Sequence, residues 1–279
     1  MLKKIMYENN LKEHFLKQLK KRTLEDLSLS KVSYNKLDNV LKSDKDIALE
    51  AIKHERFIYY DVPNNLKKNR EIILASVKKY GLILEFVPNK FKNDKEIVLE
   101  AVKNCGFSLK YASKKLREDK DIVLKAIKSD GWALKFVGKK FFRDPEFLFQ
   151  AVKYHGYAFE LLPQKYKFDI SFIEKSLKIH NYILSFLDQK LRTNYDFIKK
   201  SINLNGLCLK YVPEKFKNDK DLVLLAVKQN GLSLAFVEGE LKRDKEIITE
   251  AIKQNIKSID YVENSMKLNK EIAEIFMNC

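Results

Sequence analysis

The sequence is poor in the residues that build disulfide frameworks and metal sites. Its 279 residues include only three cysteines, and Cys105, Cys208 and Cys279 lie far apart. We therefore expect neither a disulfide framework nor a zinc cluster, and a reducing compartment such as the cytoplasm fits this cysteine usage. Long apolar runs are missing as well, whereas a membrane span needs about 18 to 20 apolar residues in a row. We expect no membrane span.

Motifs that carry catalysis are also missing. The four histidines, at His14, His54, His155 and His180, form no HxxxH or HExxH pattern. His155 and His180 stand at equivalent places in the repeat described below, but helix packing would keep their backbones about 10 Å apart, too far to assume a shared metal ion. No glycine-rich phosphate loop or nucleophile elbow occurs. We expect a non-enzymatic protein with no catalytic residue, metal or cofactor.

Arginine is scarce although positive charge is in excess. The net charge is +16, yet only seven of the 54 basic residues are arginine. An excess of lysine attracts nucleic acid, anionic membranes and acidic proteins, whereas specific recognition of phosphates and bases usually favours arginine. The net charge alone is therefore weak evidence for a nucleic-acid partner.

A 25-residue repeat without insertions or deletions organises most of the chain. Its first position holds Asp or Asn in all ten occurrences: Asp44, Asn69, Asp94, Asp119, Asp144, Asp169, Asn194, Asp219, Asp244 and Asn269. Seven residues later nine of the ten hold a small residue: Ala51, Ser76, Ala101, Ala126, Ala151, Ser176, Ser201, Ala226 and Ala251. Glycine follows twelve residues after the first position in six repeats: Gly81, Gly106, Gly131, Gly156, Gly206 and Gly231.

The repeat from Asp94 to Glu118 shows the expected local structure. Asp94 can cap a helix over about 94–104, because a carboxylate accepts the free N–H groups of a first turn. Gly106 is expected to end this helix in the left-handed conformation. A short second helix is expected from its apolar residues, which are Phe107, Leu109, Tyr111, Ala112 and Leu116. Proline should stop this second helix in four repeats, at Pro63, Pro88, Pro163 and Pro213.

Two helices this short cannot close a core, so the repeats must stack. The sequence therefore predicts an all-α fold, an α-solenoid of about nine 25-residue helix-turn-helix repeats. Residues 1–43 fit the repeat poorly and are expected to form an N-terminal helical cap, with Leu2, Ile5, Leu16 and Leu19 on one helix and a degenerate second helix at Leu37 and Leu41. No linker separates this cap from the array at 44–279, so we expect one continuous domain.

The last repeat departs from the pattern at Phe276, where other repeats hold a small residue. We expect this end either to fold over as a bulky cap or to pair with a second copy of the chain. The sequence leaves the oligomeric state open between these two arrangements.

The segments 94–106 and 219–231, which read DKEIVLEAVKNCG and DKDLVLLAVKQNG, resemble the helical repeat known as domain of unknown function 4116. The resemblance spans most of the chain and weakens between about 166 and 205. It implies the stacked helical fold and supplies no established activity or catalytic residue. Such repeats occur in intracellular bacteria, protists and large viruses, sometimes in secreted effectors, so the resemblance leaves delivery into a host cell open.

Lysine recurs nine residues after the first position and defines a lysine ladder: Lys53, Lys78, Lys103, Lys128, Lys153, Lys178, Lys228 and Lys253. Base in the last turn and acid in the first turn both complement the helix dipole, so structure alone explains the ladder. The alternative is binding of a polyanion such as nucleic acid. Two more basic columns precede each first position, one from Lys90 to Lys215 and the other from Lys42 to Lys267, and we interpret them as a solvated edge neutralised by neighbouring acids.

The pattern changes character in the repeats that begin at Asp144, Asp169 and Asn194. The residue after the first position is Lys or Arg in the other seven repeats, but Pro145, Ile170 and Tyr195 here. Together with Phe142 and Phe168 these residues form what we call the apolar interruption. Aromatic residues among charges often mark a protein contact, although the rings could also repack an irregular turn. We therefore expect a scaffold that binds a protein through the apolar interruption, with polyanion binding as the alternative.

Overall fold

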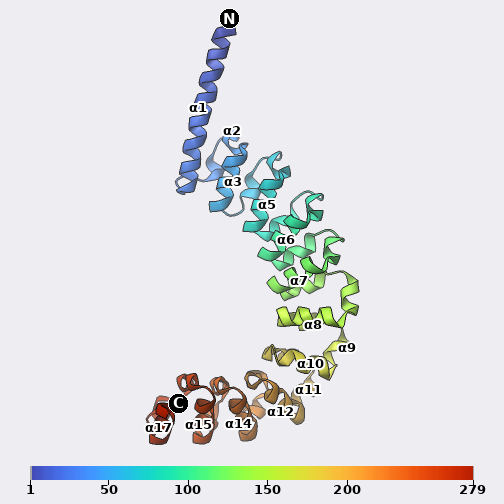
Figure 1. Cartoon of the computed structure of the whole chain (residues 1–279), viewed down its shortest axis with the longest axis vertical. Helices are drawn as coiled ribbons and strands as arrows, with labels where there is room; N and C mark the ends of the chain where they lie inside the picture. Colours follow the sequence, from blue (N-terminus) through green and yellow to red (C-terminus); the bar gives the residue numbers. More distant parts are fainter. Residues whose placement is uncertain (1, 279) are drawn as a thin grey trace. The chain divides into compact units, whose positions relative to one another are not determined.

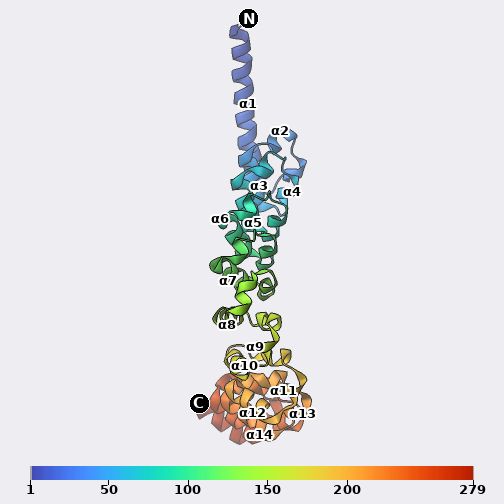
Figure 2. The ribbon, with the colours of Figure 1, turned by 90° about the vertical axis from the view of Figure 1, so that its right-hand side faces the viewer.

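The computed structural model describes residues 2–278, and every regular element among them is helical (Figure 1). This confirms the all-α class. The chain divides into two compact units, the first ending at Phe141 and the second beginning at Phe142. Within each unit the helices pack in chain order (Figures 1 and 2). No helix among the described residues combines the length and the apolar character needed to cross a bilayer.

The first unit is built from one long helix followed by short ones. Its elements are α1 (Leu2–Ser28), η1 (Tyr34–Lys36), α2 (Asn39–Lys42), α3 (Lys45–His54), α4 (Ile58–Asp61), η2 (Leu66–Lys68), α5 (Arg70–Lys79), η3 (Gly81–Glu85), η4 (Phe91–Asn93), α6 (Lys95–Asn104), η5 (Gly106–Tyr111), η6 (Leu116–Glu118), α7 (Lys120–Ser129) and η7 (Gly131–Phe136), where η denotes a 3-10 helix. The next element, η8 (Lys139–Arg143), spans the boundary between the units.

The second unit continues the same alternation of longer and shorter helices. Its elements are α8 (Pro145–Tyr154), η9 (Gly156–Leu161), α9 (Gln164–Lys167), α10 (Ile170–Leu177), η10 (Asn181–Phe186), α11 (Gln189–Thr193), α12 (Tyr195–Leu204), η11 (Gly206–Tyr211), α13 (Glu214–Lys217), α14 (Lys220–Gln229), η12 (Gly231–Phe236), η13 (Gly239–Arg243), α15 (Lys245–Gln254), η14 (Ile256–Tyr261), α16 (Asn264–Lys267) and α17 (Lys270–Asn278).

Each repeat begins with its longest helix, which we call helix A. In α6 the Asp94 carboxylate accepts the N–H groups of Glu96 and Ile97 at 3.1 and 3.2 Å. The first-position side chain accepts an N–H of the first turn in all ten repeats, which confirms the expected N-caps. Each such cap stabilises a helix by about 1 kcal/mol. The small residue seven positions later is buried in all nine repeats that have one, so it faces the stack as expected.

The expected short second helix is present, and it is a 3-10 helix in the repeats from α5 to α15, whereas the repeat of α3 has the short α-helix α4. In the repeat of α6, Gly106, Leu109 and Ala112 are buried at the three-residue spacing of a 3-10 helix, and Ser108 is buried beside Leu109. A further short helical turn follows before the next helix A, for example η4 between Pro88 and Asp94. Proline therefore separates two turns of the connection and does not lead directly into the next repeat.

The expectation that Gly106 ends helix A in the left-handed conformation is wrong. Helix α6 ends at the extended residue Cys105, and Gly239 is the only glycine with a positive φ among the described residues. Glycine is needed because the next repeat comes so close: a Cβ at Gly106 would lie 2.3 Å from the backbone oxygen of Ala126. The same approach recurs at Gly81, Gly206 and Gly231, against the carbonyls of Ala101, Ala226 and Ala251.

Hydrogen bonds between repeats complete the ends of the A helices. Asn104 Oδ1 accepts the N–H of Gly81 at 2.8 Å, while its Nδ2 donates to the Lys78 carbonyl at 3.1 Å. Gln254 accepts the N–H of Gly231 in the same way. These side chains satisfy backbone groups that a helix end leaves without an internal partner. In these repeats a side chain of one repeat therefore holds backbone groups of the preceding one.

The C-terminal half of α1 covers the first repeat. Thr23 and Leu27 are buried, and Lys20 bonds to Asp44 and Asp46 at 2.9 and 2.6 Å. Leu16 is exposed and Leu19 is half-buried, while the side chains of Leu2 and Ile5 lie outside the described ones. Leu41 is buried within α2, where a degenerate second helix was expected. The single continuous domain stays a prediction.

The last helix buries only part of its apolar face. In α17 Ile272 is buried, whereas Phe276 is 40% exposed. Cys279 and the side chain of Ile275 lie outside the described residues. Pairing of this end with a second copy stays a prediction.

Replacing Gly106 with alanine should destabilise the fold by about 1 to 3 kcal/mol, because a new methyl group would press on a backbone carbonyl that cannot rotate away. Gly138→Ala is the control, since the three atoms nearest to its new methyl group belong to the Glu118 side chain and none of them to the backbone. Chemical denaturation measures the free energy of unfolding of both variants. A Gly106→Ala protein as stable as the Gly138→Ala protein would contradict the close approach as the reason for glycine.

Candidate functional site

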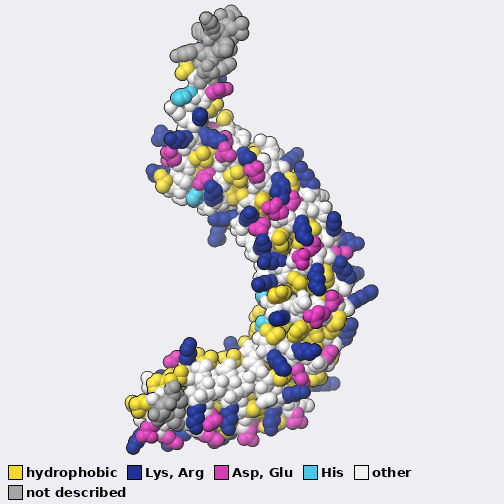
Figure 3. Space-filling model, in the orientation of Figure 1, with side chains coloured by type: hydrophobic (Ala, Val, Ile, Leu, Met, Phe, Trp, Pro, Cys, Tyr) yellow, Lys and Arg dark blue, Asp and Glu magenta, His cyan; other side chains and the backbone are white. Residues whose placement is uncertain are grey.

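Ion pairs join the first turns of neighbouring A helices. In several repeats the basic residue after the first position reaches an acid of the next repeat: Lys45 to Glu71 at 2.9 Å, Lys95 to Asp119 at 2.8 Å, and Lys220 to Glu246 at 2.9 Å. Arg70 contacts both acids of the next repeat, Asp94 and Glu96. We call this set the ion-pair row. Basic and acidic side chains lie intermixed on the face of the protein that Figure 3 shows.

The apolar interruption removes the cations of this row in the second unit. Pro145, Ile170 and Tyr195 occupy the positions of Lys or Arg, and all three are exposed. The Tyr195 hydroxyl lies near Asp219 and Asp221, and desolvation together with these carboxylates raises the pKa of Tyr195. The Tyr195 ring also packs on Phe216 with centroids 6.1 Å apart. Tyr195 therefore contacts the next repeat from the same position as Lys45 or Lys220 in the regular repeats, but it brings no positive charge.

The two phenylalanines of the interruption have different environments. Phe168, which ends the turn before α10, is 57% exposed. Phe142 is half-buried and therefore partly fills the turn before α8. The prediction that these residues lie in the turns and first turns entering three successive A helices agrees with the positions of α8, α10 and α12. Their role in binding stays a prediction.

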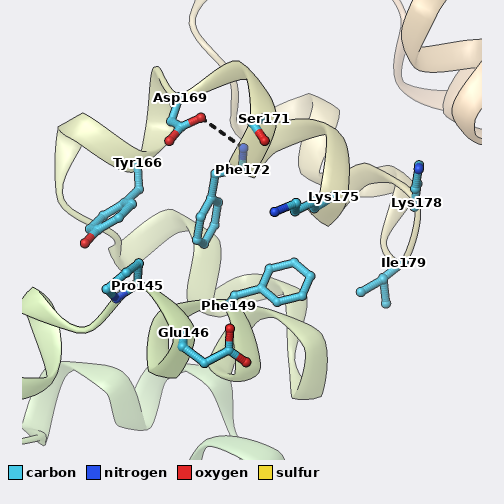
Figure 4. A pocket seen from close by; sticks show the side chains of 10 residues that line it. All are labelled: Pro145, Glu146, Phe149, Tyr166, Asp169, Ser171, Phe172, Lys175, Lys178 and Ile179. Carbon is cyan, nitrogen blue, oxygen red and sulfur yellow. Dashed lines mark hydrogen bonds between the residues drawn. The ribbon is translucent and has the colours of Figure 1, made fainter.

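A groove of about 620 Å³ opens between α8 and α10, beside the interruption (Figure 4). Pro145 and Tyr166 lie at one end of it, and Lys178 and Ile179 lie at the other. Phe172 is nearly buried, and its ring meets Phe149 edge to face at 5.8 Å. The groove therefore has an aromatic floor between two helix ends.

The bulk of these two rings explains why the groove is there. Helices α8 and α10 pack less extensively than α5 and α6 do. The atoms nearest to a Cβ at Gly156 are in the Tyr182 and His180 side chains, and no backbone carbonyl approaches as Ala126 does in the regular stack. The close approach is thus relaxed at this point, and the helices leave space between them.

Charge is divided between the two ends of the groove. Lys175 points in over the aromatic floor, and Lys178 lies near the end of α10 (Figure 4). Among the described residues, neither lysine has a carboxylate within ion-pair distance. Asp169 and Glu146 lie toward the other end, and Asp169 caps Phe172 N at 3.1 Å. The sequence does not predict the groove, and of the lining residues its patterns single out only Pro145 and the ladder lysine Lys178.

The lysine ladder is exposed along its whole length but is partly neutralised. Lys53 and Lys103 pair with glutamates of their own helices at 2.7 and 2.6 Å. Lys228 and Lys253 lie 3.9 and 3.7 Å from the same glutamate, Glu250. The ladder is therefore a less uniform cationic surface than its sequence spacing suggests.

The two basic columns of the turns are explained by local contacts. Lys67 and Lys92 donate to the carbonyls of Tyr60 and Glu85, at the ends of the preceding short helices, at 2.9 and 2.8 Å. These bonds satisfy helix C-terminal carbonyls, where a cation is favoured. Where the next residue is aromatic, the lysine of the other column lies over its ring, as Lys90 does over Phe91 at 4.7 Å. The interpretation as an edge neutralised by acids is therefore incomplete.

Among the described residues, no group of three or more His, Cys, Asp or Glu side chains is placed so that it could hold a metal ion. His180 Nε2 lies 3.2 Å from the Lys153 carbonyl, and the His180 ring packs on Tyr182. Burial raises the pKa of the Cys208 thiol to about 12, so this cysteine stays protonated at neutral pH. The contacts of His180 and the burial of Cys208 are those of residues that pack in the fold.

The fold defines this chain as an all-α solenoid of short helical repeats. A family model described as domain of unknown function (DUF4116) matches the residues 69–117, 94–142, 144–192, 194–242 and 224–267. The matches cover well over half of the chain, and the protein belongs to this family. The first two matches begin one 25-residue repeat apart, at Asn69 and Asp94. Comparison with curated proteins and with solved structures gives no match.

Acid should weaken the fold partly through the ion-pair row. The Arg70 guanidinium, which bonds to Asp94, holds the pKa of that carboxyl below its ordinary value. A carboxyl with a lowered folded-state pKa contributes stability above its unfolded pKa, and this contribution is lost as pH falls through the folded pKa. Asp94→Asn keeps the cap, as Asn69 shows, but cannot titrate. Its stability should fall less than that of the wild type between about pH 5 and pH 2.

Denaturation across this pH range checks the prediction. Arg70→Met should flatten the acid dependence in the same way, because it removes the cation that lowers the Asp94 pKa. Parallel pH profiles for the wild type and both variants would count against a titrating ion-pair row.

Proposed function

We propose that this protein is a non-enzymatic helical-repeat scaffold that binds another protein through the apolar interruption. The supporting observation is that exposed apolar side chains replace the ion-pair row. Phe168, Ile170 and Tyr195 are 57%, 41% and 38% exposed. Elsewhere the same edge carries lysine paired with acid, which water solvates well.

The physical chemistry of interfaces favours such a patch as a contact surface. Protein interfaces combine a desolvated apolar or aromatic centre with a polar rim. Lys165, Lys167 and Lys190 lie in the turns around the exposed side chains and can supply that rim. Each exposed ring loses contact with water on binding, whereas the surrounding lysines can stay hydrated.

Polyanion binding through the lysine ladder is the less supported alternative. Ladder lysines that pair with glutamate, such as Lys53 and Lys103, would have to exchange these partners for phosphates. Steep weakening with salt and no sequence preference are expected of such binding. The protein-binding proposal predicts a contact that salt weakens much less.

Ile170→Lys with Tyr195→Lys should abolish partner capture while leaving the midpoint of thermal unfolding nearly unchanged, because the double variant restores the residue type of the regular repeats. Affinity purification from the native host followed by mass spectrometry measures capture. Val40→Lys with Leu268→Lys is the control, since these apolar residues are 67% and 86% exposed outside the interruption. Equal capture by the wild type and the Ile170 and Tyr195 double variant would overturn the proposed function.

A further inference from the structure

We propose that the groove between α8 and α10 binds a peptide segment of a partner protein in which an apolar side chain is followed closely by acidic residues. This inference rests on the proposed function and gives the partner a chemistry. It follows from three features of the groove, which are its aromatic floor, its unpaired lysines and its place beside the interruption.

The floor fits an apolar anchor. Phe149 and Phe172 meet edge to face and leave a hollow bounded by Pro145 and Ile179 (Figure 4). Ile179 is 41% exposed. An aliphatic or aromatic side chain placed there would cover both Phe149 and Ile179, and burial of such surface favours binding roughly in proportion to the area removed from water.

The lysines fit acidic neighbours of that anchor. Several other outward lysines of helix A pair with acids of the protein, as Lys200 does with Glu174 at 2.6 Å and Lys103 with Glu100 at 2.6 Å. Lys175 and Lys178 have no such partner among the described residues, and both line the groove. A carboxylate of the occupant would provide the missing charge at little cost, because no internal ion pair has to break. Charge complementarity of this kind selects among partners.

The acids at the other end give the bound segment a direction. Glu146 and Asp169 lie near the first turns of α8 and α10, away from Lys178 (Figure 4). Acidic residues are therefore favoured over the end of α10 and disfavoured over its beginning. The segment would place its acids beside Lys175 and Lys178 and extend its other end toward Ile170 and the rest of the interruption.

Selection of random dodecapeptides displayed on phage, with the full-length protein as bait, tests the proposal. The selected peptides should share an apolar residue with at least a pair of nearby Asp or Glu residues. A selected peptide is then synthesised, and the Lys175→Glu with Lys178→Glu double variant should bind it with about tenfold lower affinity than the wild type does. Lys125→Glu with Lys128→Glu makes the same charge change at the equivalent positions of α7 and should leave the affinity within about twofold.

The apolar half of the groove has its own matched pair of variants. Ile179→Asp should also lower the affinity for the peptide about tenfold. Ile256→Asp is the control, because Ile256 is 42% exposed and lies on a different element, η14. A peptide with lysines in place of its acids should bind the Lys175 and Lys178 double variant better than it binds the wild type. These results together would support the groove as the site.

Three outcomes would overturn the proposal: selection of peptides without acidic residues, equal weakening by the two glutamate double variants, or binding of single-stranded DNA that depends on Lys175 and Lys178 but not on Ile179. Failure of the groove is distinguishable from failure of the proposed function. If Ile170→Lys with Tyr195→Lys abolishes partner capture but the groove variants do not, the interruption binds and the groove does not.

Discussion

The close approach of neighbouring backbones sets the spacing on which the rest of the structure depends. A carbonyl in the middle of each regular helix A lies against the glycine of the preceding repeat, as the Ala126 carbonyl does against Gly106. A side chain at either contact position would separate the repeats, because a packed interior does not deform smoothly. Glycine and the small residue of the next helix A are therefore two parts of one contact, although Gly106 and Ala126 are 20 residues apart in the chain.

Fixed spacing turns sequence periodicity into rows of facing side chains. Once every helix A follows its neighbour at the same distance, the residue after one cap must meet the acids of the next, as Arg70 meets Asp94 and Glu96. Each exposed pair contributes little by itself. The row nevertheless keeps the edge hydrated and charge-balanced, so a repeat that lacks its cation presents a chemically different surface.

The sequence was sufficient for the elements that depend on local signals. The cap at Asp94 and the buried face of α6 follow from a carboxylate in front of a helical apolar pattern, and the structure has both. The 3-10 form of the second helix was missed because the 3.0-residue and 3.6-residue periods differ little over six residues. Gly106 was misread because its local meaning, a helix end, is more common than its actual one, a contact with the next repeat.

Only one half of the candidate site, the apolar interruption, could be predicted from the sequence, because the groove depends on contacts between repeats. Residues that break a column, such as Ile170, are seen when the repeats are aligned. The groove is not, because it depends on how far two helices stand apart, and that distance is set by the rings of Phe149 and Phe172 together. No single column shows that these rings would meet edge to face, so a volume between helices had no signature in the alignment.

Pro145 and Ile170 of the interruption belong to the same two helices, α8 and α10, that form the groove. Larger side chains between α8 and α10 relax the close approach, and a longer gap makes a lysine after the cap less able to reach the next acids. Pro145 cannot form that ion pair, and Ile170 has no charge to contribute. Loss of the cation therefore costs little stability where the repeats are already loosely packed. The stack can tolerate an apolar edge at this point, and that tolerance makes the edge and the groove available together for binding.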